Sequence, residues 1–213
     1  MLKLVIISDT HGLHDQVKDI PEGDVLIHCG DISNIGKYHQ IMEFLHWFND
    51  HPHKHKIFIA GNHDWLFDLA PSMGKICTDY FQDSIIYLEN SDVVIEGKKF
   101  YGSPIVPPFN HWAFNREDEE RISYWEKIPS NTDVLITHGP PRTILDLSHY
   151  GNIHCGCQYL YQEVVNRIKP TLHCFGDIHE AYGLVTHNDT TFINASLLNQ
   201  YYKVVNQPRV ITI

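Results

Sequence analysis

Five short apolar runs of the sequence each end in side chains that can bind a divalent metal ion. In chain order these are Asp9 and His11, then Asp31 and Asn34, then Asn62, His63 and Asp64, then His138, and finally Asp177 and His179. Asp and Asn also occur at strand ends because they form turns, but turn formation does not call for histidine at four of the five ends. The pattern therefore predicts a metal site assembled from the ends of several strands.

Oxygen and imidazole donors in this number favour a borderline or hard ion such as Mn²⁺, Fe²⁺, Zn²⁺ or Mg²⁺. The seven potential ligands among them are too many for one tetrahedral ion and suit two ions that share a carboxylate. A pair of ions about 3.5–4 Å apart is a common device for phosphoester hydrolysis, because it stabilises both the attacking and the leaving oxygen. We therefore expect two divalent ions, with Mn²⁺ as the first candidate.

The elements that must position these residues are buried strands. Short apolar runs rich in Val, Ile and Leu begin five segments, at residues 3–12, 24–31, 56–64, 133–141 and 171–180, and each run ends in a glycine or polar cluster. Their continuous rather than alternating apolar character predicts strands that are covered on both faces.

Helical and hairpin patterns lie between and after these runs. Residues 36–50 carry Ile41, Phe44, Leu45 and Phe48 at spacings of three and four, as expected for a helix. Tight hairpin turns are predicted at residues 96–98 and 187–189, and residues 209–213 have the pattern of a last strand. Together the patterns predict an α/β fold, a two-sheet β-sandwich flanked by helices, as one domain over residues 1–213.

Composition narrows the class of protein. The chain has 213 residues, a formal net charge of -10 and no apolar run long enough to cross a membrane. The acidic balance disfavours nucleic acid as a partner, so we expect a small-molecule substrate. The first apolar run begins at Met1 and leads directly into functional residues, so we expect no signal peptide. The five cysteines are an odd number and scattered, so we expect reduced thiols rather than disulfides. Together these features predict a cytoplasmic location.

The sequence also contains sixteen histidines, an unusually high number. Three of them, His51, His53 and His55, lie beside a proline and two lysines, and we interpret this segment as a solvated loop.

Five segments together resemble the motifs of the calcineurin-like metallophosphoesterases. They are "DTH" at 9–11, "GDISN" at 30–34, "GNHD" at 61–64, "THGPP" at 137–141 and "GDIH" at 176–179. Further segments resemble the small metallophosphoesterase-domain-containing branch, which is associated with cyclic nucleotide hydrolysis: "SPIVPPFNHWAFN" at 103–115, "GCQYL" at 156–160, "HEAYG" at 179–183 and "FINAS" at 192–196.

The resemblance implies a role for each motif residue. Asp9, His11 and His179 hold the first ion, Asp31 bridges the ions, and Asn62, His138 and the residue at position 177 hold the second ion. His63 contacts the phosphate and protonates the leaving oxygen, and Asp64 orients the His63 ring. Asn34 lies near the phosphate. The hypothesised reaction is in-line attack on phosphorus by a hydroxide that bridges the two ions.

Position 177 departs from the family pattern, which is Gly-His-x-His where this chain has Gly176, Asp177, Ile178 and His179. Three interpretations are open. Asp177 replaces imidazole as a ligand and favours a harder ion; or it leaves the second site weak; or it disables turnover, so that the chain binds ions or nucleotide as a regulator.

The substrate is expected to be a cyclic or linear nucleotide phosphodiester. Phe109, His111, Trp112 and Phe114 either form an aromatic wall for a base or belong to a packed loop, and Arg142 either contacts a phosphate or is an ordinary surface residue. The alternatives are a nuclease of the same superfamily, which the acidic balance weakens, and the non-catalytic regulator.

Overall fold

A computed structural model describes residues 1–149 and 152–213 and contains two main β-sheets. The first sheet has the order β13-β1-β2-β3-β4, formed by β1 (Lys3–Ile7), β2 (Val25–His28), β3 (His55–Phe58), β4 (Ile86–Tyr87) and β13 (Arg209–Thr212). The second has the order β11-β12-β10-β7-β6-β5, formed by β5 (Ser91–Ile95), β6 (Lys98–Ser103), β7 (Val134–Thr137), β10 (Leu172–Phe175), β11 (Gly183–His187) and β12 (Thr190–Asn194). A small hairpin pairs β8 (Leu147–Ser148) with β9 (Ile153–His154). The predicted two-sheet α/β fold is confirmed.

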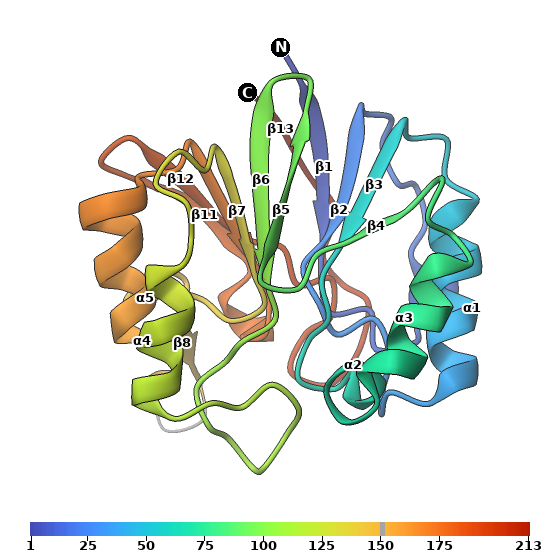
Figure 1. The fold of residues 1–213 in the computed structure, drawn as a ribbon, viewed down its shortest axis with the longest axis horizontal. Coiled ribbons are helices and arrows are strands. Elements are labelled where there is room, and N and C mark those ends of the chain that lie inside the picture. Colours follow the sequence, from blue (N-terminus) through green and yellow to red (C-terminus); the bar gives the residue numbers. More distant parts are fainter. Residues whose placement is uncertain (150–151) are drawn as a thin grey trace.

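Helices cover the outer face of each sheet (Figure 1). The α-helices are α1 (Tyr38–Asn49), α2 (Trp65–Leu69), α3 (Pro71–Asp79), α4 (Asp118–Glu126) and α5 (Gln158–Glu163). A π-helical turn, Val164–Ile168, continues α5, and short 3-10 turns span His14–Gln16 and His179–Ala181. Among the described residues, no helix is both long and apolar enough to cross a bilayer.

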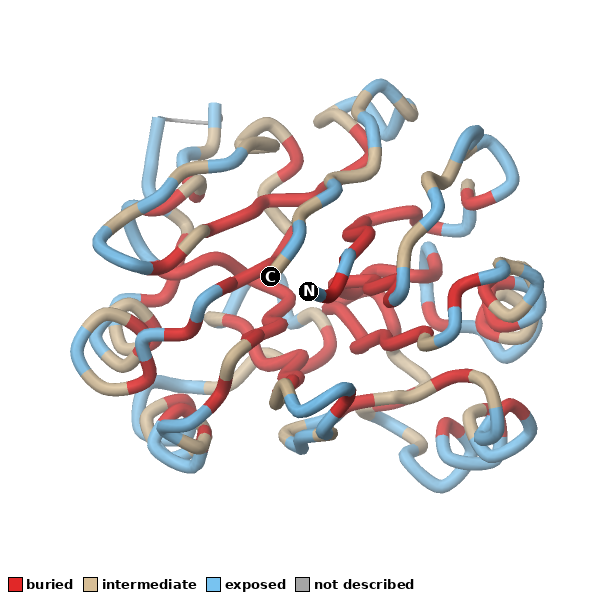
Figure 2. Tube along the Cα trace, turned by 90° about the horizontal axis from the view of Figure 1, so that it is seen from above, coloured by how far each residue is buried: buried red, intermediate tan, exposed pale blue. Residues whose placement is uncertain are grey.

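The central strands are buried on both faces because each one lies between two apolar layers. In β1, Leu4 and Ile6 belong to the core between the two sheets, whereas Val5 and Ile7 belong to the core beneath the helices. The same division holds along the other central strands, so the buried residues form the inner part of the fold in Figure 2. Each fully buried aliphatic side chain contributes roughly 1.5–3 kcal/mol relative to exposure.

The predicted helix at 36–50 is confirmed as α1, whose buried residues are Ile41, Phe44, Leu45 and Phe48. Both predicted hairpins are present, since β5 pairs antiparallel with β6 and β11 with β12. The solvated loop expected at residues 51–55 is wrong for His53, which is 3% exposed and hydrogen-bonds through Nε2 to the carbonyl oxygen of Pro21 (2.9 Å).

The five strands that carry the metal-binding motifs lie parallel within their sheets. β1, β2 and β3 are parallel neighbours in the first sheet, and β7 and β10 are parallel neighbours in the second. Their carboxyl ends lie at the edge of the sandwich opposite the two chain ends (Figure 1). An isolated bridge between Ser8 and Ser196 joins the two sheets at this edge. Loops from both sheets therefore meet at one place.

Candidate metal centre

Five of the seven predicted ligands converge at this edge within reach of a common ion or pair of ions. Three groups have ligand atoms that all lie within 4.8 Å of one another: Asp9, His11 and His179; Asp9, Asp31 and His138; and His11, Asp31 and His63. Asp9, His11 and Asp31 each belong to two of these groups. Asp31 has one oxygen 3.4 Å from His11 Nε2 and the other 3.4 Å from His138 Nε2, as expected of a shared carboxylate. We call Asp9, His11, His179 and Asp31 the first pocket, and Asp31, Asn62, His138 and Asp177 the second pocket.

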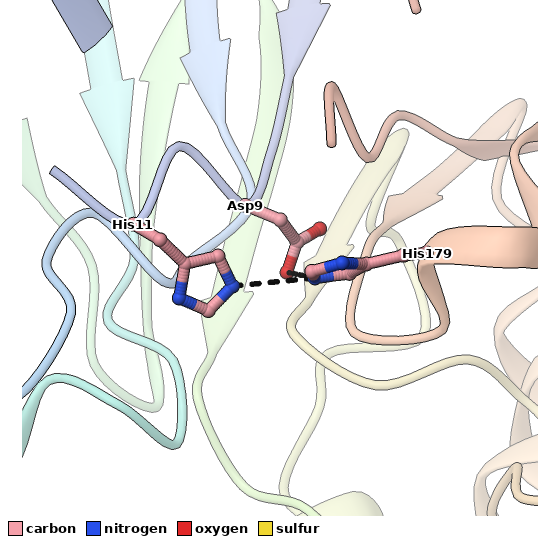
Figure 3. A group of neighbouring side chains, drawn as sticks. All are labelled: Asp9, His11 and His179. Atoms are coloured by element: carbon pink, nitrogen blue, oxygen red, sulfur yellow. Dashed lines mark hydrogen bonds and ion pairs between the residues drawn. The ribbon is translucent and has the colours of Figure 1, made fainter. Parts of the chain in front are cut away.

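In the first pocket, the imidazoles of His11 and His179 face each other beside the Asp9 carboxylate (Figure 3). His11 Nε2 lies 3.2 Å from His179 Nε2. Asp31 Oδ2 lies 3.4 Å from His11 Nε2, and Asp9 Oδ1 lies 3.7 Å from His179 Nε2. The donor atoms of all four side chains therefore point into one small volume.

The second pocket is centred on His138 Nε2. That nitrogen lies 2.7 Å from Asn62 Oδ1, 3.4 Å from Asp31 Oδ1 and 3.8 Å from Asp177 Oδ1. His138 Nδ1 donates to the carbonyl oxygen of Cys29 (3.0 Å). Asp177 thus has a carboxylate oxygen at the pocket, although its side chain remains 28% exposed.

These separations fit a metal centre. Ligand bonds of about 2.0–2.2 Å place neighbouring donor atoms about 3.0 Å apart around an octahedral ion and about 3.4 Å apart around a tetrahedral one. The distances between donors in the two pockets run from 3.2 to 3.8 Å, apart from the hydrogen-bonded Asn62–His138 pair. The residues present therefore fit divalent ions in both number and spacing.

Hydrogen bonds hold the carboxylates of the first pocket in place. Ser196 donates to Asp9 Oδ2 (2.6 Å), and the backbone N–H of Asp177 lies 3.2 Å from both Asp9 oxygens. The backbone N–H of His63 donates to Asp31 Oδ1 (2.8 Å). Such partners fix the direction of a ligand and its basicity.

The loops that carry the ligands are strained. Asp9, His11, Asp31 and Asp177 all have φ between 45° and 66°, in the left-handed region. A non-glycine residue held there costs roughly 1–3 kcal/mol, and such strain gathers at functional sites. Two motif glycines allow the close approach: a Cβ at Gly176 would lie 2.0 Å from Asp9 Oδ2, and one at Gly61 would lie 2.2 Å from Asp31 Oδ1.

Protonation of the first pocket follows from its charges. Burial by itself lowers the pKa of His179, but the negative charge of the adjacent Asp9 carboxylate outweighs burial and raises this pKa to about 9. Burial lowers the pKa of His11 to about 4. The carbonyl oxygen of Asn199 accepts from His179 Nδ1 (3.1 Å), so the second proton of His179 lies on Nε2 and points to neutral His11.

The second pocket also contains a histidine whose pKa is raised by a neighbouring carboxylate. Burial by itself lowers the pKa of His138, but the adjacent Asp31 carboxylate raises it well above its usual value. Both ring nitrogens face oxygen acceptors, Cys29 O and Asn62 Oδ1, as expected of an imidazolium. A divalent ion would displace a proton from His138 and one from His179, because a metal-bound imidazole is neutral at that nitrogen.

His63 lies next to both pockets, but a different group from the expected one orients its ring. Nδ1 donates to the carbonyl oxygen of Asn34 (2.7 Å), and the indole of Trp112 stacks on the ring with centroids 4.1 Å apart. The contact expected from Asp64 is wrong. The Asp64 carboxylate instead accepts backbone N–H groups of Ile32, Ser33 and Gly61 and so fixes the loops that carry Asp31 and Asn62.

The predicted substrate residues divide into two groups. Trp112 lies at the site, on His63, whereas His111 is exposed. Phe114 is 1% exposed and belongs to the core, so of the two interpretations of this segment the packed loop holds for Phe114. The Asn34 side chain is exposed, and Arg142 is also exposed and donates from Nη1 to the carbonyl oxygen of His154 (3.3 Å).

Several residues of the site were not found from the sequence. Ser196, Asn199 and Tyr202 support the first pocket from a segment far along the chain, and only the "FINAS" segment hinted at this. His28 and His173 are fully buried and hydrogen-bond to the hydroxyls of Thr10 (3.0 Å) and Thr137 (2.8 Å), next to ligands. Burial lowers the pKa of His28 and that of His173 to about 3, so both rings are neutral anchors.

Comparison with known proteins agrees with this site. A sequence profile described as calcineurin-like phosphoesterase matches residues 2–181. The chain is 37% identical to metallophosphoesterase domain-containing protein 1 of Homo sapiens, and to that of Mus musculus, over 98% of this chain and 70% of each relative. The solved structure of TT1561 of Thermus thermophilus has the same fold, with a TM-score of 0.65 at 13% identity over 98% of this chain and 97% of that one. The chain therefore belongs to the calcineurin-like phosphoesterase family, whose members are metal-dependent phosphoesterases.

Proposed function

We propose that the chain is a phosphodiesterase that hydrolyses small phosphodiesters, nucleotides among them, with two divalent ions held in the first and second pockets. Mn²⁺ is the proposed ion because the pockets mix imidazole, carboxylate and amide donors. The observation that carries the proposal is the position of Asp31 between the pockets. Its Oδ2 lies 3.4 Å from His11 Nε2 in the first pocket, and its Oδ1 lies 3.4 Å from His138 Nε2 in the second. The five free cysteines support a cytoplasmic location.

When bound, the ions lower the pKa of water and neutralise charge on the phosphoryl oxygens. Water attacks phosphorus and releases one proton to solvent as the bond to the leaving ester oxygen breaks, and His63 donates one proton to that oxygen. The Asn34 carbonyl and the Trp112 indole hold the His63 ring for this transfer.

Charge in the two pockets favours a diester over a monoester. The pockets contain three carboxylates, of Asp9, Asp31 and Asp177, against the four positive charges of two divalent ions. The single positive charge that remains matches the monoanion of a phosphodiester better than the dianion of a phosphomonoester. Asp177 is thus proposed as a ligand that also sets the charge of the site.

The first test is hydrolysis of bis(4-nitrophenyl) phosphate by metal-stripped protein during titration with Mn²⁺. We expect turnover that appears with Mn²⁺ and disappears with chelator. A chain that binds Mn²⁺ without any turnover would contradict the proposal and favour the regulator, and salt-sensitive binding of single-stranded DNA would favour the nuclease.

The role of His63 is tested with His63→Gln and two leaving groups. Since 4-nitrophenolate leaves without a proton, its release should slow by less than about tenfold. Release of an alkoxide needs the proton, so we expect a loss of about 10²-fold or more with an alkyl phosphodiester. Equal losses with both leaving groups would contradict proton donation by His63.

A further inference from the structure

Residues 199–203 form a tight turn beside the first pocket. Asn199 Oδ1 accepts the backbone N–H groups of Tyr201 (3.0 Å) and Lys203 (3.1 Å), and the Asn199 N–H donates to the carbonyl oxygen of Lys203 (3.0 Å). The N–H of Tyr202 donates to the Asn199 carbonyl oxygen (2.9 Å). These bonds hold the turn in a single conformation.

One atom joins this turn to the proposed metal ligands. The carbonyl oxygen of Asn199 accepts both the Tyr202 N–H and His179 Nδ1–H (3.1 Å). The orientation of the His179 ring and the position of the Tyr202 backbone are therefore coupled.

The Tyr202 ring lies against the imidazoles. Its centroid is 4.8 Å from that of His11 and 5.4 Å from that of His179, with interplanar angles of 66° and 68°. Both are edge-to-face contacts, an arrangement that aromatic pairs favour. One phenol ring thus touches both imidazoles whose Nε2 atoms face each other.

The backbone of Tyr202 is held in an unfavourable conformation to place the ring there. Its φ is 56°, in the left-handed region that bulky residues rarely adopt. The bonds of Asn199 impose this conformation, while 46% of the Tyr202 surface stays exposed. Strain that the surroundings maintain at a large, half-exposed side chain points to a function for that side chain.

We infer that Tyr202 is a positioning residue of the first pocket. Its ring keeps the imidazoles of His11 and His179 turned so that both Nε2 atoms are directed at one ion, and it covers the two rings from solvent. The inference rests on the proposed function, because it assumes that this pocket binds a divalent ion. Removing groups that orient metal ligands commonly lowers metal affinity 10- to 100-fold.

The test is calorimetric titration of metal-stripped protein with Mn²⁺, which measures binding without turnover. Tyr202→Ala should weaken the tighter binding event about tenfold, whereas Tyr202→Phe, which keeps the ring, should stay within about threefold of the unchanged chain. Tyr201→Ala is the matched control, since Tyr201 lies on the same turn and is 69% exposed. We expect its Mn²⁺ affinity to match that of the unchanged chain.

Tyr202→Gly separates loss of the ring from backbone strain, because glycine adopts the left-handed conformation readily and also removes the ring. Loss of affinity in both Tyr202→Ala and Tyr202→Gly, with the metal-free melting temperature kept in at least one, supports the inference. Unchanged affinity in these variants would overturn it, and so would a loss in Tyr202→Phe as large as in Tyr202→Ala, because the hydroxyl would then be the active group. No Mn²⁺ binding by the unchanged chain would overturn the proposed function as well.

Discussion

The two pockets share Asp31 but differ in how firmly their residues are held. In the first pocket, Ser196, Asn199 and Asp177 N–H fix Asp9 and His179 from outside. In each pocket two proposed ligands are hydrogen-bonded to each other, His11 Nε2 to His179 Nε2 at 3.2 Å in the first and Asn62 Oδ1 to His138 Nε2 at 2.7 Å in the second. The second pocket differs in its shorter bond and in Asp177, which is partly exposed. An ion must break the Asn62–His138 bond to enter the second pocket. We therefore expect the first pocket to bind its ion more tightly.

Asp31→Asn removes the one carboxylate common to both pockets and should have the largest effect. Each ion stabilises the transition state by several kcal/mol, so we expect kcat/KM with Mn²⁺ to fall by about 10²-fold or more. Asp83→Asn, at an exposed carboxylate, is the control and should leave the rate unchanged. If Asp31→Asn weakened binding at only one pocket, the two pockets would not share this carboxylate.

Stability of the metal-free chain should fall as pH rises, because of the first pocket. The folded chain raises the pKa of His179 to about 9 from an ordinary 6.5, so the stabilisation is complete below about pH 6.5 and is lost as pH rises through about 9. It amounts to at most about 3 kcal/mol, or roughly 10 °C in melting temperature. His138, whose pKa is also raised, acts in the same direction.

The measurement is thermal unfolding in chelator between pH 6 and 9.5, repeated with saturating Mn²⁺. Bound ions take the place of the protons, so the alkaline loss should shrink when Mn²⁺ is present. An identical pH dependence with and without Mn²⁺ would mean that the ions do not bind at these histidines.

Much of this site could be predicted from the sequence, because each strand end is marked by an apolar run followed by polar residues. The parallel strands bring their carboxyl ends to one edge, so Asp9, Asp31 and His138 could be placed together from apolar runs and the polar residues that follow them. Helix spacing was equally informative for Phe44 and Phe48, which pack on a sheet through one face of α1.

The support around the ligands could not be predicted in this way. Ser196 and Tyr202 reach the first pocket through tertiary contacts with residues about 190 positions away, and no local pattern encodes such a contact. His53 was misplaced because a short polar segment does not reveal which of its side chains turns inward. Asp64 was misassigned because its four hydrogen bonds are to backbone and Ser33, which a motif does not specify.

Ser196→Ala should weaken the first pocket alone. The hydroxyl donates to Asp9 Oδ2 at 2.6 Å, and its loss leaves a buried carboxylate oxygen with one partner fewer. We expect the tighter Mn²⁺ dissociation constant to rise about tenfold, with the weaker one unchanged. Ser123→Ala, at an exposed helix position, is the control. A change in both binding events would show that the pockets are coupled rather than separately held.

Asp177→His acts on the second pocket and should have the smallest effect on diester hydrolysis, because it exchanges one ligand for another. If Asp177 is a working ligand, the rate with bis(4-nitrophenyl) phosphate should change less than about tenfold. The exchange also removes one negative charge, so hydrolysis of 4-nitrophenyl phosphate, a dianion, should rise relative to that of the diester.

Asp177→Asn separates charge from ligation in this last experiment, because the amide keeps the length of the side chain and loses only the charge. A similar rise in the monoester-to-diester ratio in both variants would assign the selectivity to the Asp177 charge. A gain in diester rate of about 10²-fold or more in Asp177→His would instead mean that aspartate leaves the second pocket weak. The two pockets would then differ in occupancy as well, with an ion bound in the first pocket and the second pocket largely empty.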